Sequence, residues 1–168
     1  DNKILWENET NEFSNKIFVA ENYIFRQADH SITVLDKNNQ QFVIAEIDGN
    51  IINVSRENGK TGIVVKDNGQ TLFILNGNNE VVVDNKEFKD IITGLSISDK
   101  SEAYSLITLT FENGNPINTL YFNLIEDVEL WSALIENEIL IKTKVINNNV
   151  IAIGTKNIYF YNNNGKLM

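Results

Sequence analysis

The sequence predicts an all-β fold built from four repeats. Similar segments recur about every forty residues, and each reads as short apolar strands separated by polar turns. The last strands of the four segments also share one pattern. Repeats of roughly 40 to 45 residues with four antiparallel strands are typical of β-propeller blades. We therefore interpret residues 1–168 as one propeller-type domain, or as a fragment of a longer one, with repeats at 4–40, 41–80, 81–127 and 128–166.

The first two repeats show the strand order most clearly. Asn58-Gly59 separates two apolar runs of the second repeat, and Asn-Gly is the strongest short signal of a hairpin, because a type I′ turn needs positive φ at both central residues. The predicted strands of these two repeats are residues 4–6, 16–20, 23–27, 31–36, 42–46, 51–55, 61–66 and 71–75.

The third repeat is longer than the others, with its extra length in residues 99–112 and a turn at 113–116. The final strand of every repeat is a run of β-branched and aromatic residues that ends in Asp or Asn. β-Branched and aromatic residues pack well on a pleated surface, so these runs favour strands. The predicted strands of the third and fourth repeats are residues 81–83, 91–97, 103–111, 119–124, 128–131, 139–145, 150–154 and 158–161.

Residues 126–141 allow a second interpretation. Their apolar residues have near-helical spacing, which alone would favour an amphipathic helix. The repeat alignment instead places a strand, a loop and a strand there, and we favour the strands because the repeat register is the broader evidence. The apolar residues concerned are Val128, Trp131, Leu134, Ile135 and Ile139.

The two ends of the sequence are related, since residues 165–168 resemble residues 2–5. In one explanation, residues 4–6 complete the fourth blade and close a four-bladed ring. In the other, the chain is a piece of a larger propeller, whose exposed sheet edges would make it self-associate, and two copies could complete an eight-bladed ring. Because the chain begins at Asp1, we also expect a longer precursor with a leader or membrane anchor; an arbitrary boundary of the sequence is the alternative.

Composition excludes several classes of protein. The net charge is −9 and the 14 basic residues are scattered, so the basic stripe that binds nucleic acid or an anionic membrane is missing. The absence of Cys excludes disulfides, a thiol nucleophile and a Cys-ligated metal. The sequence has no apolar run of about eighteen residues and no signal peptide. Its 27 Asn and 23 Ile suggest the AT-rich codons of a low-GC Gram-positive bacterium.

Several stretches resemble a known group of proteins. Residues 22–25 (Asn-Tyr-Ile-Phe) and 31–39 (Ser-Ile-Thr-Val-Leu-Asp-Lys-Asn-Asn) are similar to blades of bacterial quinoprotein-like and WD40-like propellers. Residues 2–6 and 128–131 approximate the "G-K-x-x-W" run of an uncharacterised family from low-GC Gram-positive bacteria. That resemblance implies an extracytoplasmic propeller, with an N-terminal membrane anchor in the full-length protein.

The sequence also departs from the related families. The tryptophan-docking motif of quinoproteins is absent apart from its terminal Trp, so we expect no quinone cofactor and no dehydrogenase activity. The Trp-Asp and Gly-His signatures of true WD40 repeats, the glycine pair of kelch blades and the Asp box of sialidases are missing as well.

Candidate catalytic and metal-binding residues are few. His30 is the only His and is expected in an exposed turn, so it supports neither a general base nor a zinc site. Residues 36–40 begin like a calcium loop but lack the Gly at the sixth position and the terminal Glu. Paired carboxylates could hydrolyse glycosides, but most of those present adjoin Gly or Asn in turns and are better explained by capping. They are Asp36, Asp48, Asp67, Asp84, Asp99, Glu126 and Asp127.

Other residues are explained by packing. Trp6 and Trp131 occupy equivalent positions in the first and fourth repeats, which predicts contacts between blades. The strand tyrosines are interpreted in the same way: Tyr104, Tyr121, Tyr159 and Tyr161. Asn8 and Asn53 match the N-glycosylation pattern, without consequence in a bacterial protein. We therefore assign no catalytic, cofactor-binding or metal-binding residue.

The predicted function is non-catalytic. We expect a scaffold or sensor domain of the bacterial envelope that binds a protein or envelope component through loops on one propeller face, starting with residues 99–116. A carbohydrate-active hydrolase or lyase with two carboxylates is the first alternative. A subunit-assembly module, whose function is to pair into a larger ring, is the second.

Overall fold

The computed structural model describes residues 16–20, 23–28, 31–35, 41–46, 49–76, 80–100, 102–126 and 128–168. In this part of the chain all regular structure is β, and no helix is long and apolar enough to cross a membrane. The strands form four antiparallel sheets, which confirms the predicted fold class.

Each sheet is a meander of strands that follow one another in sequence. The first contains β1 (Lys16–Ala20), β2 (Tyr23–Ala28), β3 (Ser31–Leu35) and β4 (Gln41–Glu46), and the second β5 (Asn50–Glu57), β6 (Lys60–Lys66), β7 (Gln70–Leu75) and β8 (Val81–Phe88). The third contains β9 (Ile91–Ile97), β10 (Ala103–Glu112), β11 (Asn115–Leu124) and β12 (Glu129–Glu136), and the fourth β13 (Leu140–Ile146), β14 (Asn149–Gly154) and β15 (Ile158–Tyr161).

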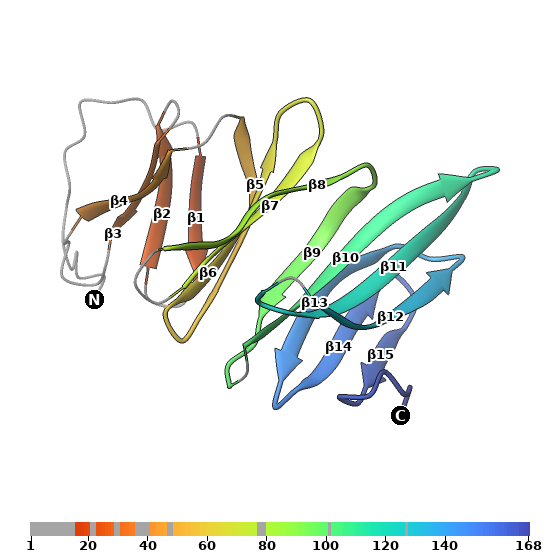
Figure 1. Ribbon diagram of the computed structural model, residues 1–168. Coiled ribbons are helices and arrows are strands. Elements are labelled where there is room, and N and C mark those ends of the chain that lie inside the picture. Colours follow the sequence, from red (N-terminus) through yellow and green to blue (C-terminus); the bar gives the residue numbers. More distant parts are fainter. Residues whose placement is uncertain are drawn as a thin grey trace, which may run out of the picture.

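The four sheets stand in a row, with the first at one end and the fourth at the other (Figure 1). The first strands of the sheets lie next to one another, because β1 contacts β5, β5 contacts β9 and β9 contacts β13. This is the arrangement of propeller blades, whose first strands surround a central channel. We call β1, β5, β9 and β13 the inner strands.

The sheets are offset by one strand from the sequence repeats. β4 begins the predicted repeat 41–80 but pairs with β3 as the outer strand of the first sheet, and β8 and β12 do the same for the second and third. In the fourth sheet, Leu167 makes an antiparallel bridge to Tyr161 at the same position. Each outer strand is therefore supplied by the start of the next sequence repeat. Residues 4–6, the predicted ring-closing strand, lie outside the described residues.

Most predicted strands of the described chain are present, but β8, β11 and β12 extend four or five residues further than predicted at one end. Residues 128–141 form parts of β12 and β13, so the strand interpretation is confirmed and the helix is wrong. The extra length of the third repeat lies in the long β10–β11 hairpin, whose two strands and turn were predicted. Asn58-Gly59 and Asn113-Gly114 have positive φ at both residues, as predicted for tight hairpins.

Apolar layers between successive sheets form the core of the described chain. Ile63 and Val65 of β6 pack toward the first sheet, while Val64 between them packs toward the third. In β10, Leu106 faces the second sheet and Ile107 the fourth. The middle strands are thus apolar on both faces, because each lies between two other sheets.

Trp131 joins the third sheet to the fourth. Its ring lies 5.5 Å from that of Phe122 and 5.4 Å from that of Tyr161 on β15, between ring centroids. Its indole N–H donates a hydrogen bond to the carbonyl of Asn163 at 3.2 Å. The predicted packing between blades is therefore confirmed for Trp131, whereas Trp6 lies outside the described residues.

Candidate functional site: the inner-strand groove

A groove of about 690 Å³ runs along the inner strands. It is lined by residues 53–57 of β5, 93–96 of β9 and 141–144 of β13, together with Ala20 of β1. Because inner strands are the edges of their sheets, the groove is bordered by backbone as well as by side chains. In a β-propeller, the corresponding surface of the inner strands lines the central channel.

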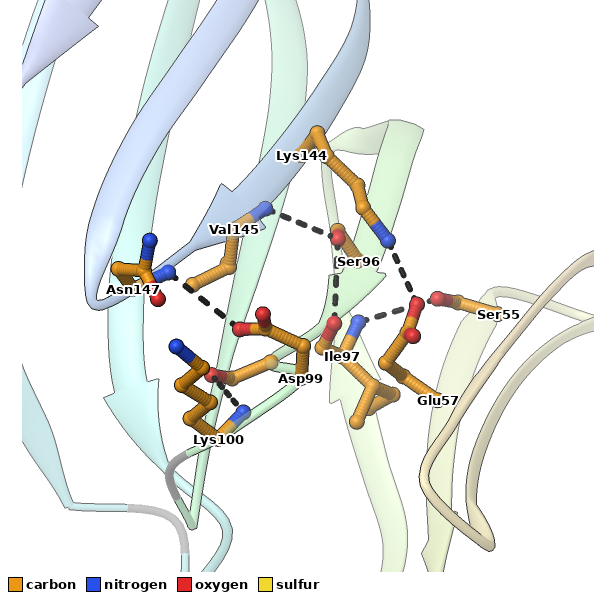
Figure 2. A network of polar contacts seen from close by, with 10 residues as sticks. Ser55, Glu57, Ser96, Ile97, Asp99, Lys100, Lys144, Val145 and Asn147 are labelled. Carbon is orange, nitrogen blue, oxygen red and sulfur yellow. Dashed lines mark hydrogen bonds and ion pairs between the residues drawn. The ribbon is translucent and has the colours of Figure 1, made fainter.

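Serine side chains connect one inner strand to the next (Figure 2). The Ser55 hydroxyl of β5 accepts a hydrogen bond from the backbone N–H of Ile97 at 3.0 Å. The Ser96 hydroxyl of β9 accepts one from Val145 at 3.1 Å. These bonds satisfy edge amides that would otherwise lack a partner and fix the spacing of β5, β9 and β13.

Amide side chains make a second set of connections between sheets. Each accepts a hydrogen bond from a backbone N–H near the start of the next inner strand, over a sequence separation of 22 to 24 residues. The pairs are Gln27 with Ile51 (2.8 Å), Gln70 with Ile92 (2.8 Å) and Asn118 with Leu140 (2.9 Å). The groove therefore has a wall held in place by polar contacts from every preceding sheet.

The groove carries more positive than negative charge. Glu57 is the one carboxylate among its described lining residues, and Lys144 pairs with it at 2.6 Å. Arg56 lies over the ring of Tyr23, 4.2 Å from its centroid. Lys142 is exposed. Because Arg56 is buried, the charges that face solvent are Lys142 and the Lys144–Glu57 pair, which give a local charge of about +1 in a chain whose net charge is −9.

The carboxylates named from sequence do not gather in this groove. Asp67 is exposed and accepts a hydrogen bond from Asn68 at 3.0 Å, and Glu126 is exposed. Asp99 lies near the groove and accepts the backbone N–H of Asn147 at 3.3 Å (Figure 2). Asp84 belongs to β8. The remaining three, Asp36, Asp48 and Asp127, lie outside the described residues.

The described residues contain no group of three or more His, Asp or Glu side chains able to hold a metal ion. His30, the calcium-like segment 36–40 and Asn8 fall outside this part of the chain. Asn53, the other residue of the glycosylation pattern, lines the groove.

Glu138, which the sequence did not single out, is the most perturbed carboxylate of the described chain. It is buried in the turn between β12 and β13. Its side chain accepts hydrogen bonds from the hydroxyl of Tyr159, from the side chain and backbone of Asn157 and from the backbone of Lys156. These donors, Tyr159 foremost, lower the pKa of Glu138 to about 2 despite burial, which opposes the shift. The arrangement is structural, since every donor belongs to the turn that follows β14 or to β15.

The tyrosines have packing and hydrogen-bonding roles. Tyr104 is fully buried, and its hydroxyl accepts a hydrogen bond from Asn123 at 2.8 Å. Tyr121 packs against the layer between the second and third sheets. Burial raises the pKa of Tyr161, and the hydrogen bond to Glu138 raises that of Tyr159.

Comparison with known proteins supports the fold and no narrower assignment. No family model matches the chain, and no curated protein matches its sequence. The solved structure of Hsv2 from Kluyvelomyces marxianus is similar with a TM-score of 0.65 at 13% identity, over 92% of this chain and 48% of that one. Dipeptidyl peptidase 4 of Porphyromonas gingivalis gives 0.63 at 10% identity, over 99% and 33%. The N-terminal domain of Nup159 gives 0.52 at 8%, over 96% and 48%.

These structures contain β-propellers, so the likeness shows a propeller-like fold. The chain spans at most about half the length of the three proteins. One of them is named as a peptidase, and likeness of fold does not decide between an enzyme and a binding domain.

Proposed function

We propose that this chain is a non-catalytic binding domain that holds an extended, acidic segment of a protein partner in the inner-strand groove. The observation that carries the proposal is the solvent-facing charge of the groove, about +1 within a chain of net charge −9. The groove is also long, open and fixed in shape by the serine and amide contacts between sheets. A rigid groove suits an extended ligand because little ordering is needed on binding.

The residues that would meet an acidic ligand first are Lys142 and Lys144. Lys142 is exposed, and Lys144 is half-exposed beside Glu57. The side-chain amide of Asn53, which lines the groove and is partly exposed, can exchange hydrogen bonds with a peptide backbone. This site lies on the inner strands, whereas residues 99–112, where we expected to look first, mostly belong to β10.

A direct test compares two fluorescent decapeptides, one rich in Asp and one rich in Lys, by anisotropy at low salt. We expect the acidic peptide alone to bind, and Lys142→Glu to weaken its binding by about thirtyfold, since one close charge contact is worth about 1 kcal/mol and reversal doubles the effect. Lys66→Glu, at an exposed position of β6 outside the groove, is the matched control. Equal binding of both peptides, or equal losses in both variants, would contradict the proposal.

Catalysis by paired carboxylates is not favoured by this groove. A glycosidase needs two carboxyl groups about 5 to 10 Å apart, and Glu57, the one carboxylate among the described lining residues, is paired with Lys144. The test is to incubate the protein with bacterial wall polysaccharides and measure the release of reducing ends. If the wild type released them and Glu57→Gln did not, the non-catalytic assignment would be overturned.

We also propose that the domain acts in the bacterial envelope, outside the cytoplasm and anchored to the membrane in the full-length protein. This rests on the sequence resemblance to the uncharacterised family of low-GC Gram-positive bacteria. Digestion of intact cells with an external protease tests it: the full-length protein should be degraded while a cytoplasmic marker survives. Protection of both proteins would contradict this location.

A further inference from the structure

The inner strand of the first sheet exposes apolar residues at places that are buried in later sheets. Ile97 of β9 and Val145 of β13 each donate a backbone N–H to a serine of the preceding inner strand, and both side chains are fully buried. Val19 has the place of Val145 in β1, because each forms the second pair from the turn of its hairpin. Val19 is 73% exposed, and Ile17 on the same side of β1 is 65% exposed. The first sheet stands at the end of the row, so no other described sheet covers them (Figure 1).

The fourth sheet, at the other end of the row, exposes the opposite half of such a contact. In the third sheet, Phe122 and Leu120 of β11 pack toward the fourth sheet and are buried. Aligned on the equivalent residues of β9 and β13, the strand registers give Phe160 of β15 the place of Phe122. They likewise give Ile158, 56% exposed, the place of Leu120. We call Ile17 and Val19 the head face, and we define the tail face by the apolar residues on the outward side of β14 and β15: Ile151, Ile153, Ile158 and Phe160.

Successive sheets of the described chain contact one another through unlike faces. The inner strand of a sheet packs on the first two strands of the sheet before it, as β9 contacts β5 and β6, and β13 contacts β9 and β10. At Gly62 of β6 the approach is close, since an added Cβ would lie 2.9 Å from Leu95 and 3.1 Å from Ile97 of β9. Ile151 has the place of Gly62 in the fourth sheet. In a following sheet it would therefore contact the equivalents of Leu95 and Ile97, which in the first sheet are the head-face residues.

We propose that the tail face of one copy of this chain binds the head face of a second copy, and that two such contacts close a ring of eight sheets. In each contact, β1 of one copy lies on β13 and β14 of the other and repeats the packing that joins the sheets within the chain. A contact between unlike faces forms a ring when the rotation between copies closes. Eight sheets are within the usual range of four to eight propeller blades. Because one chain carries both faces, a second copy supplies everything that the ring needs.

The lysines beside the tail face are compatible with this contact. Lys142 and Lys144 lie on the same side of the fourth sheet as the tail face. They belong to the inner strand and line the groove, at the places that Asn53 and Ser55 occupy in β5. Lys144 reaches along the groove to Glu57, at 2.6 Å. The charged ends of both lysines therefore stay in the water of the channel, while their apolar stems lie beside the contact.

On the head side, the contact is confined to β1. The outward residues Arg26, Thr33 and Leu35 of β2 and β3 are already buried, so a second copy meets the first sheet at its inner strand. This contact is smaller than one between complete sheets, and association should therefore depend on concentration. Each copy has a net charge of −9, so added salt should strengthen association by screening the repulsion.

The absence of Cys allows the pairing of the two faces to be tested directly. Val19→Cys places one thiol on the head face, and Ile151→Cys places one on the tail face. A short bismaleimide should cross-link a mixture of these two variants but neither variant alone. Leu134→Cys, on β12 and 62% exposed, is the control and should not cross-link with either of them. Cross-linking of Ile151→Cys with itself, or no more cross-linking in the mixture than with the control, would refute the contact.

Sedimentation velocity of the 168-residue chain at increasing concentration, at low and high salt, tests the ring. We expect a dimer and no larger species, and Val19→Lys should raise the dissociation constant by at least about tenfold. Leu134→Lys should leave the dissociation constant unchanged, and circular dichroism checks that both variants fold. A monomer under all conditions, or equal effects of the two substitutions, would overturn the proposal. A series of oligomers that grows without limit would rule out the closed ring.

Discussion

The substitution Glu138→Gln removes a negative charge from the turn between β12 and β13 while keeping the shape of the side chain. The carboxylate accepts hydrogen bonds from Tyr159, from Asn157 at 2.8 Å and 3.1 Å and from Lys156 at 3.0 Å. A Cβ added at Gly154 would lie 2.1 Å from a carboxylate oxygen of Glu138, so the carboxylate is closely packed against the backbone of Gly154. Charge-assisted hydrogen bonds of this kind link the end of the third sheet to the fourth.

The magnitude follows from the pKa of Glu138, which is lowered from 4.5 to about 2. At 1.36 kcal/mol per unit the full shift is about 3 kcal/mol, and we expect about 2 kcal/mol after allowing for screening by nearby solvent. Because the pKa is lower in the folded state, this contribution is fully present above pH 4.5 and is lost as the pH falls toward 2. The wild type should therefore lose stability in that window.

Urea unfolding at a series of pH values, followed by tryptophan fluorescence, measures the effect. The informative quantity is the difference in unfolding free energy between wild type and Glu138→Gln, because the other carboxylates titrate in both. The difference should shrink by about 2 kcal/mol between pH 5 and pH 2. Tyr159→Phe, which removes the leading donor, should show a smaller change over the same range. Parallel curves for wild type and Glu138→Gln would refute this account.

The remaining predictions concern contacts between sheets and turns, and each is checked by denaturant unfolding. Trp131→Ala should lower the free energy of unfolding by about 2 kcal/mol, because it removes the ring contact that joins the third sheet to the fourth. Leu134→Ala lies on the same strand at an exposed position and should lower it by about 0.5 kcal/mol or less. Gly165→Ala should destabilise more than Gly114→Ala: both have positive φ, costing about 1 kcal/mol, but only at Gly165 would the added Cβ lie 2.8 Å from the Trp131 ring. Ser96→Ala should cost about 1 kcal/mol and speed hydrogen exchange of the β13 amide that it binds, and unchanged exchange would contradict the assigned contact.

The strands could be predicted from sequence because their signals are local. Asn58-Gly59 and Asn113-Gly114 adopt positive φ as their residue types require, and the apolar runs beside them pair in the expected hairpins. The assignment of β4 to the first sheet could not be predicted, since the sequence of Gln41–Glu46 does not show whether it pairs with the strand before it or with the strand after it. The repeat period gives the number of strands but not the point at which one sheet ends.

The groove escaped prediction for a related reason. Ser96 and Val145 are 49 residues apart in sequence, and a serine in an apolar strand gives no sign of the amide it will bind. Glu138 could not be distinguished from the other acidic residues by sequence, because its hydrogen-bond donors lie 18 to 21 residues later, in the turn after β14 and in β15. The packing of Trp131 and of the strand tyrosines could be predicted, since their positions in the repeats and strands imply contacts within the core.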